Sequence, residues 1–135
     1  MELSDSTRIM AGILLLALIT VESGGVFMTK LVRGQAPATP FQLGFARAGH
    51  AHAGVLLILS LVMQVYVDGS GLTGFGEWAA RSLVPIAAIL MPAGFFFSSM
   101  GAGRTEANRF MVLVWIGGLC LAAGLATLGI GLLVK

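Results

Sequence analysis

Residues 45–67 read FARAGHAHAGVLLILSLVMQVYV, and this stretch decides the fold class. Its length exceeds the roughly 20 residues that a helix needs to cross the hydrocarbon core of a bilayer. Three ionisable side chains, Arg47, His50 and His52, lie near its start. Ionisable groups are costly at membrane depth, so by default they mark a functional site or a paired structural contact. The sequence therefore predicts a transmembrane helix that carries the candidate site.

The composition of the whole chain is that of a membrane protein. Of its 135 residues, 57% are hydrophobic and only 10% are charged, whereas soluble domains carry about 25% charged residues. The net charge is +2, and no basic patch is interleaved with aromatic residues, so we expect no nucleic-acid partner. The single cysteine, Cys120, excludes a disulfide bond within the chain.

Four stretches, residues 9–27, 45–67, 82–100 and 110–134, are long and apolar enough to span a membrane. The segments between them are short and rich in Gly, Pro or charge, which is typical of loops that join antiparallel neighbours. We therefore expect an all-α integral membrane protein whose single domain, residues 1–135, forms an up-down four-transmembrane-helix bundle. The expected location is a prokaryotic-type inner or plasma membrane.

The N-terminus resembles a cleaved signal peptide only in part. Arg8 precedes an apolar run, as in a signal peptide, but the following TVESGG contains no convincing cleavage site. We therefore expect the first helix to be retained.

Alternation of the four helices brings most of the unusual polar residues to one membrane face. These residues are Glu22, Arg47, His50, His52, Ser98, Ser99, Arg104, Asn108 and Arg109. The opposite face carries what read as ordinary flanking charges: Asp5, Arg8, Asp68, Glu77, Arg81 and Lys135. The asymmetry predicts one polar site near one surface.

The spacing of the two histidines predicts two separate environments. Residues two apart on a helix point about 200° away from each other, whereas two ligands for one ion normally lie three or four residues apart. Small residues surround both histidines: Ala46, Ala48, Gly49, Ala51, Ala53 and Gly54. They leave room for a flat, wide group, or they let a neighbouring helix approach closely through Gly49 and Ala53. In the simpler alternative, each imidazole bonds a neighbouring helix or a water molecule.

The other candidate residues also have two interpretations. Glu22 is a candidate ion-pair partner of Arg47, a partner of a histidine, or a proton carrier. Arg47, Arg104 and Arg109 are candidates for bidentate binding of a carboxylate, while anchoring at the membrane surface is the simpler role for the last two. In the fourth helix, Gly117, Gly124 and Gly131 recur every seven residues. This pattern predicts a packed face against a helix of this chain or of another copy.

The stretch AGHAHAGVLLILS resembles the H-x-H helix of the catalytic subunit of haem–copper oxidases and nitric oxide reductases. That subunit has twelve helices in three similar groups of four, and its paired histidines serve two haems on opposite helix faces. RAGH, residues 47–50, is similar to a second family helix in which an arginine precedes a haem ligand by three residues. The match is a short motif.

The resemblance implies haem b with His50 and His52 as axial ligands, and Arg47, Arg104 and Arg109 near the propionates. It also implies a homotrimer of the four-helix unit in place of the twelve helices, and a redox partner. The family's copper-binding histidines have no counterpart here. The expected roles are therefore electron transfer, gas sensing or a small redox reaction.

Three alternatives remain open from the sequence. One is a copper or zinc site that uses His50, His52, Glu22 or a methionine. Another is a small proton-coupled transporter, because Glu22 resembles the essential glutamate in the first helix of small multidrug resistance transporters. The third is a non-catalytic membrane assembly subunit, in which the polar residues only hold helices together. Basic residues slightly favour a cytoplasmic site face, whereas the family's topology implies the outer face.

Overall fold

The structure is a computed structural model that describes residues 2–134, and this range contains helices and no strand. The helices are α1 (Asp5–Val32), α2 (Pro40–Ser70), α3 (Gly74–Ser98) and α4 (Val112–Leu133), and a short 3-10 helix, η1 (Arg109–Met111), leads into α4. Four helical segments, the last counted from Arg109, are long and apolar enough to cross a membrane. The prediction of an all-helical chain with four such segments is confirmed.

Local sequence explains where the helices begin. The Ser4 hydroxyl caps α1 by accepting a hydrogen bond from the Thr7 amide. Thr39, directly before Pro40, caps α2 and forms a capping box with Gln42. The start of α3 at Gly74, eight residues before the expected residue 82, corrects the prediction that this segment is a loop. The Glu77–Arg81 pair, four residues apart, stabilises that added part of the helix.

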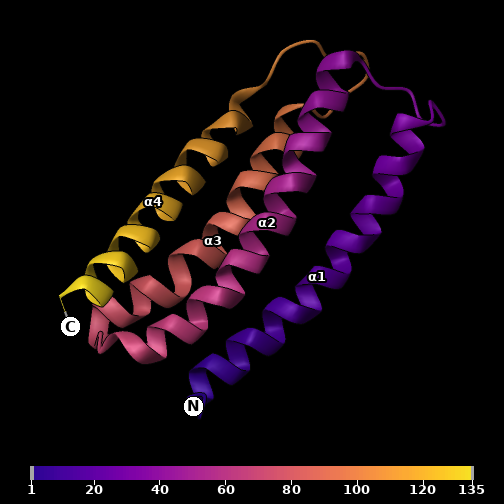
Figure 1. Cartoon of the computed structure of the whole chain (residues 1–135). Coiled ribbons are helices and arrows are strands. Elements are labelled where there is room, and N and C mark those ends of the chain that lie inside the picture. The colour runs from indigo at the N-terminus through magenta and orange to yellow at the C-terminus, as the bar shows by residue number, and fades with distance from the viewer. Residues whose placement is uncertain (1, 135) are drawn as a thin grey trace.

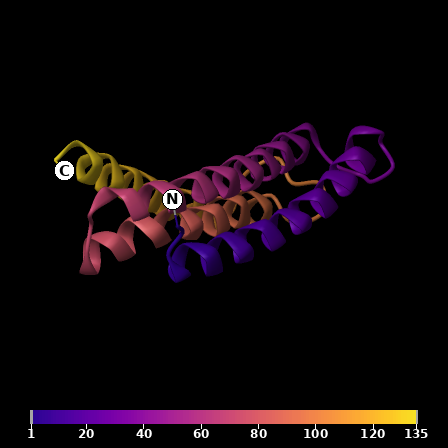
Figure 2. The same ribbon diagram turned by 60° about the horizontal axis from the view of Figure 1, so that its bottom comes forward.

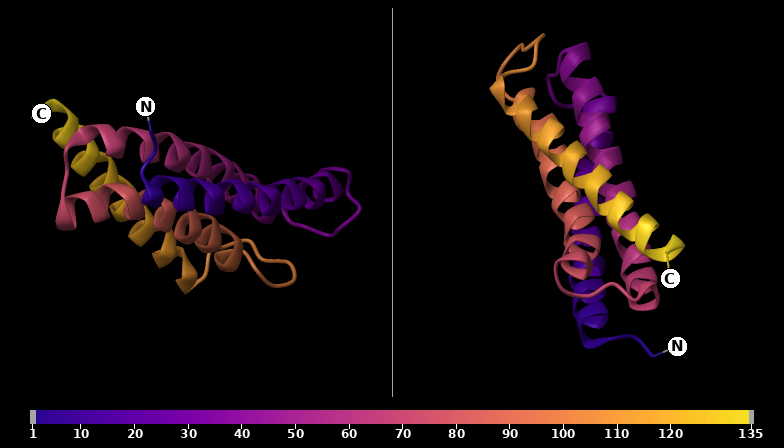
Figure 3. Two further views of the ribbon diagram at one scale, coloured as in Figure 1. Left: turned by 90° about the horizontal axis from the view of Figure 1, so that it is seen from below. Right: turned by 90° about the vertical axis from the view of Figure 1, so that its left-hand side faces the viewer.

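Successive helices run up and down as expected, but they do not close into a ring (Figure 1). α3 packs against both α2 and α4, whereas α1 packs mainly against α2. α1 and α4 therefore lie on opposite sides of the α2–α3 pair, as Figure 2 also shows. Both termini lie at one end of the molecule, and the α1–α2 and α3–α4 loops lie at the other end, which we call the loop end (Figure 3).

Glycines allow α3 and α4 to approach closely. A Cβ atom on Gly117 would lie 3.0 Å from the Met91 backbone nitrogen, and one on Gly94 would lie 2.7 Å from the Val114 nitrogen. Gly124 faces Val84 in the same way. The predicted glycine face of α4 is therefore confirmed. Gly117 and Gly124 pack against α3 of the same chain, and Gly131 packs against Leu72 of the α2–α3 loop. α3 remains helical through Pro85 and Pro92.

α1 is the most weakly packed helix. Its buried residues are Thr7 and Leu14, both in its first half. Its second half contacts α2 through small residues, including Gly24 and Gly25. The remaining surface of α1 is apolar and exposed, with Ile9, Leu16 and Ile19 among the large exposed side chains.

Candidate functional site

His50 and His52 lie at opposite borders of the packed face of α2. A Cβ atom on Gly24 of α1 would lie 3.3 Å from the His50 Nδ1, and one on Gly25 would lie 3.7 Å from its Nε2. The His52 ring packs against Phe95 of α3 with 5.0 Å between ring centroids. Both imidazoles are half-buried. The prediction of two separate environments on opposite sides of this helix is confirmed.

A backbone carbonyl selects the tautomer of a neutral His52. Its Nδ1 lies 2.7 Å from the Ala48 carbonyl oxygen, one helical turn earlier. Because a carbonyl can only accept a hydrogen bond, the neutral ring carries its proton on Nδ1, and Nε2 keeps a free lone pair. Histidines that bind metals are commonly oriented by such a bond from the other ring nitrogen. His50 forms no hydrogen bond within residues 2–134, so its tautomer is not fixed in this way.

The residues around the histidines fall into a packed group and an exposed group. Gly49 makes room for an aromatic side chain, because a Cβ atom there would lie 3.0 Å from Cζ of Phe96. Close helix packing is therefore confirmed at Gly49. Gly44, Arg47 and Ala51 are instead exposed on the outward face of α2, which by helical spacing lies between the two histidines.

Glu22 and Arg47 do not form the ion pair that was one of the candidate roles of Glu22. Both are exposed, and the three ion pairs within residues 2–134 involve neither of them. Because α1 continues to Val32, Glu22 lies roughly 15 Å along the helix from its end. This carboxylate therefore lies deeper along the helix than the sequence predicted, and it has no partner in the described part of the chain.

Arg104 and Arg109 make their contacts around the α3–α4 loop and not with the histidines. The Arg104 carbonyl accepts a hydrogen bond from the Thr39 hydroxyl. The Arg104 Nε donates to the Met100 carbonyl at 2.9 Å. Thr39 precedes His50 by roughly 16 Å along α2. The Arg109 guanidinium lies 5.7 Å from the Phe110 ring centroid. The structure therefore groups these two arginines with the loops and not with His50 and His52.

The two serines at the end of α3 also do not join the histidines. Ser98 and Ser99 both donate hydrogen bonds to the Phe95 carbonyl of their own helix, at 3.2 Å and 3.0 Å. Asn108 donates to the Phe97 carbonyl at 2.9 Å. These residues therefore shape the α3–α4 connection.

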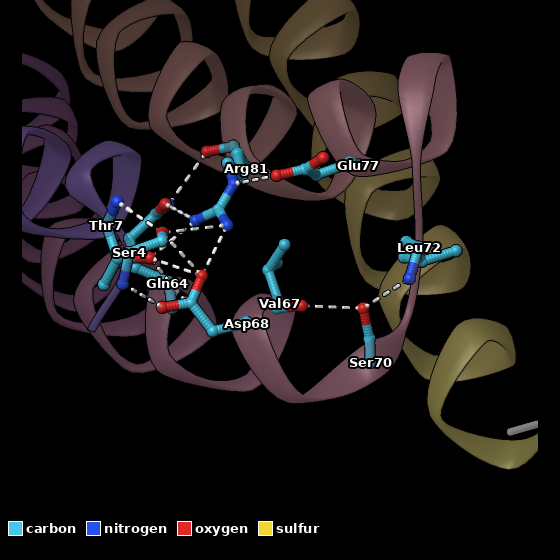
Figure 4. Close-up of polar contacts among 9 residues, drawn as sticks. All are labelled: Ser4, Thr7, Gln64, Val67, Asp68, Ser70, Leu72, Glu77 and Arg81. Atoms are coloured by element: carbon cyan, nitrogen blue, oxygen red, sulfur yellow. Dashed lines mark hydrogen bonds and ion pairs between the residues drawn. The ribbon is translucent and has the colours of Figure 1, made fainter. Parts of the chain in front are cut away.

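A buried polar network lies at the other end of the molecule (Figure 4). Arg81 of α3 is only 8% exposed. Its Nη2 lies 2.5 Å from Oδ1 of Asp68, and its Nε lies 3.0 Å from Oε1 of Glu77. Its Nη1 donates to the Thr7 hydroxyl at 2.6 Å. One arginine thus joins the start of α1, the end of α2 and the start of α3.

The remaining members complete the hydrogen bonding of this network. The Ser4 amide and hydroxyl both donate to the Asp68 carboxylate, at 3.0 Å and 2.8 Å. The side-chain amide of the fully buried Gln64 donates to the Arg81 carbonyl at 2.9 Å. Within residues 2–134, every buried side-chain nitrogen and oxygen has a partner. The network is therefore satisfied by the chain itself.

The expectation that Asp68, Glu77 and Arg81 are ordinary flanking charges is wrong, because Asp68 and Arg81 are buried against the start of α1 and Glu77 pairs with Arg81. Asp5 and Arg8 form an exposed pair and are ordinary flanking charges, as expected. Lys135 lies outside the described residues. One sequence signal was available. Gln64 and Asp68 on one helix, and Glu77 and Arg81 on the next, are each four residues apart and so share a helix face.

No family model, curated protein or solved structure matches this chain. Fold and site together define an all-helical protein with four helices fit to cross a membrane, two half-buried histidines on α2 and a buried arginine network at the end opposite the loop end.

Proposed function

We propose that the chain is an integral membrane protein that binds haem b through His52 and takes part in electron transfer. The observation that carries this proposal is the 2.7 Å contact between His52 Nδ1 and the Ala48 carbonyl. It leaves Nε2 as a neutral, oriented ligand, which is the state in which an imidazole binds a metal. The resemblance of the H-x-H helix to the oxidase helix supports the same assignment.

The set of donors suits haem better than a bare copper or zinc ion. Among residues 2–134, no three His, Cys, Asp or Glu side chains form a group that could hold a metal ion. Protein zinc sites normally use three or four such ligands. Haem iron takes only axial ligands from the protein, because the macrocycle supplies the others. One well-oriented histidine is therefore sufficient.

Small, exposed residues lie on the outward face of α2 beside the two histidines. Gly44 and Ala51 are exposed on it, and no large side chain stands at either position. Arg47, exposed on the same face, is available to a propionate carboxylate. Phe95 supplies an apolar wall beside His52. When bound, haem would supply one-electron redox chemistry, while the chain orients the ligand and pairs the carboxylate.

We further propose that copies of the chain assemble, with a trimer favoured. The open row of helices leaves Glu22 and Arg47 exposed and without ion-pair partners in the described chain. Unpaired charges facing lipid are costly, so contact with another copy would lower that cost. Three copies would also provide twelve helices, as in the resemblance. His50, on the border facing α1, would then belong to a second site.

The orientation follows from charge. Lys30, Arg33, Arg104 and Arg109 lie near the loop end, which under the positive-inside rule would face the cytoplasm. The host membrane would be a prokaryotic-type inner membrane. This orientation departs from the one that the family's topology implies.

An absorption spectrum of the purified protein tests the proposed function. After expression with a haem precursor, or after addition of haemin, the wild-type chain should show a Soret band that shifts on reduction. His52→Ala should lose most of this absorbance, while His50→Ala should retain it. Helix content from circular dichroism serves as the folding control. An unchanged spectrum in folded His52→Ala would exclude His52 as the ligand.

A further inference from the structure

Two adjoining hollows lie at the loop end, between α1, α2 and the α3–α4 loop. One has a volume of about 310 Å³ and includes Thr39, Ala102 and Gly103 in its wall; we call it the head hollow. The other has a volume of about 260 Å³ and we call it the tail hollow. They share four wall residues: Pro37, Ala38, Gln42 and Gly101. A single elongated molecule would therefore fit across both.

The tail hollow suits hydrocarbon. Its wall carries Phe27 and Leu31 from α1, Ala46 from α2, and Phe96 from α3. The two polar side chains that border it, Gln42 and Ser99, are already engaged within the chain, and the Ser99 hydroxyl donates to the Phe95 carbonyl. The Gln42 side-chain amide donates to the carbonyls of Ser99 and Gly101, at 2.9 Å and 2.7 Å. An apolar chain could thus enter without leaving a buried donor unpaired.

The head hollow lies in a region of positive charge. Arg104 lies beside it, because a Cβ atom on Gly101 would lie 3.4 Å from the Arg104 Nε. Lys30 and Arg33 are at the end of α1. None of these three cations pairs with a carboxylate in residues 2–134. The first turn of α2, which begins at the hollow, contains no acidic residue.

We propose that the two hollows together bind one anionic phospholipid. Its phosphate would lie in the head hollow beside Arg104, and one acyl chain would lie in the tail hollow. Charge complementarity and the apolar wall carry this assignment, and basic pockets between membrane helices are known to bind anionic lipid head groups. The site uses neither histidine, so it stands whether or not the chain binds haem.

Native mass spectrometry from detergent tests the charge requirement. The full chain is mixed with phosphatidylglycerol or phosphatidylcholine of identical acyl chains. We expect one phosphatidylglycerol to remain bound and phosphatidylcholine to be lost. Arg104→Gln should weaken retention about fivefold, whereas Arg8→Gln, an exposed arginine at the opposite end, should leave it unchanged. Equal retention of the two lipids, or an equal loss in both variants, would overturn the proposal.

A second pair of variants tests the place of binding. Ala38→Trp puts a large ring into the wall shared by both hollows, and Ala38 is exposed, so folding should be preserved. Ala107→Trp, at an exposed loop position outside both walls, is the matched control. We expect only Ala38→Trp to lose the lipid. Wild-type retention in Ala38→Trp, or displacement of the lipid by glycerol phosphate alone, would show that the hollows do not hold a phospholipid.

Discussion

Nη2 of Arg81 lies 2.5 Å from Oδ1 of Asp68, and each side chain is only 10% exposed. This contact joins α3 to the end of α2, and Thr7 and Ser4 extend it to α1. Because α1 has few other buried residues, the network is its main attachment at this end. Its loss should therefore loosen α1 from the other helices.

Removing either charge should destabilise the fold. We expect Arg81→Ala to lower the free energy of unfolding by about 3–5 kcal/mol, because it leaves the buried Asp68 carboxylate without a cation. Asp68→Ala should cost less, because Glu77 still pairs with Arg81. The double variant should cost less than the sum of the two. Unfolding in a denaturing detergent, followed by circular dichroism, measures these values. Arg8→Ala, from an exposed pair, should change the stability by less than about 1 kcal/mol.

Thr7 should contribute through its hydroxyl rather than through its volume. It accepts from Arg81 at 2.6 Å and donates to Asp68 at 2.9 Å. Thr7→Val retains the shape and removes both bonds, so a loss of about 1–3 kcal/mol is expected. Ser6→Ala, at an exposed neighbouring position, is the control. Equal stability of Thr7→Val and the wild-type chain would show that the network does not depend on this hydroxyl.

The close contact between α3 and α4 should tolerate no added methyl group at Gly94. A Cβ atom there would lie 2.7 Å from the Val114 backbone nitrogen, which cannot move independently. We expect Gly94→Ala to cost about 1–3 kcal/mol. At Gly118 a Cβ atom meets nothing within 4 Å, so Gly118→Ala should be neutral or stabilising by up to about 1 kcal/mol. The same detergent unfolding assay compares them, and a reversed order would contradict the packing described.

Assembly should be visible in the mass of the solubilised protein. One chain has a mass of 14.0 kDa, and we expect light scattering corrected for detergent to give three times that value. Glu22→Gln and Arg47→Gln should change the distribution of oligomers, because each removes a charge that another copy would meet. A uniform monomer for the wild-type chain would remove the homotrimer from the account.

Much of the fold could be predicted from hydropathy alone, because membrane-length apolar runs leave few alternatives. The helix ends were harder. Residues 74–80, GFGEWAA, contain two glycines and read as a loop, yet the Glu77–Arg81 pair and packing against the other helices keep them helical. The open arrangement was not predictable, because sequence spacing does not show whether α1 meets α4.

The opposite directions of the His50 and His52 side chains could be predicted, because they depend only on the local geometry of one helix. The burial of Arg81 could not, because it depends on Thr7, seventy-four residues earlier, lying against it. Charges at helix ends look alike in sequence whether or not another helix covers them. For the same reason the grouping of Arg104 with the loops, and not with the histidines, required the tertiary structure.

Chemical rescue is the most direct test of His52 as a haem ligand. In His52→Gly, haem absorbance should be lost and should return when imidazole is added, because free imidazole can take the place of the missing side chain. His50→Gly, treated identically, should keep its spectrum without imidazole. The account is contradicted if the wild-type chain takes up no haem, or if His52→Gly retains the wild-type spectrum before any imidazole is present.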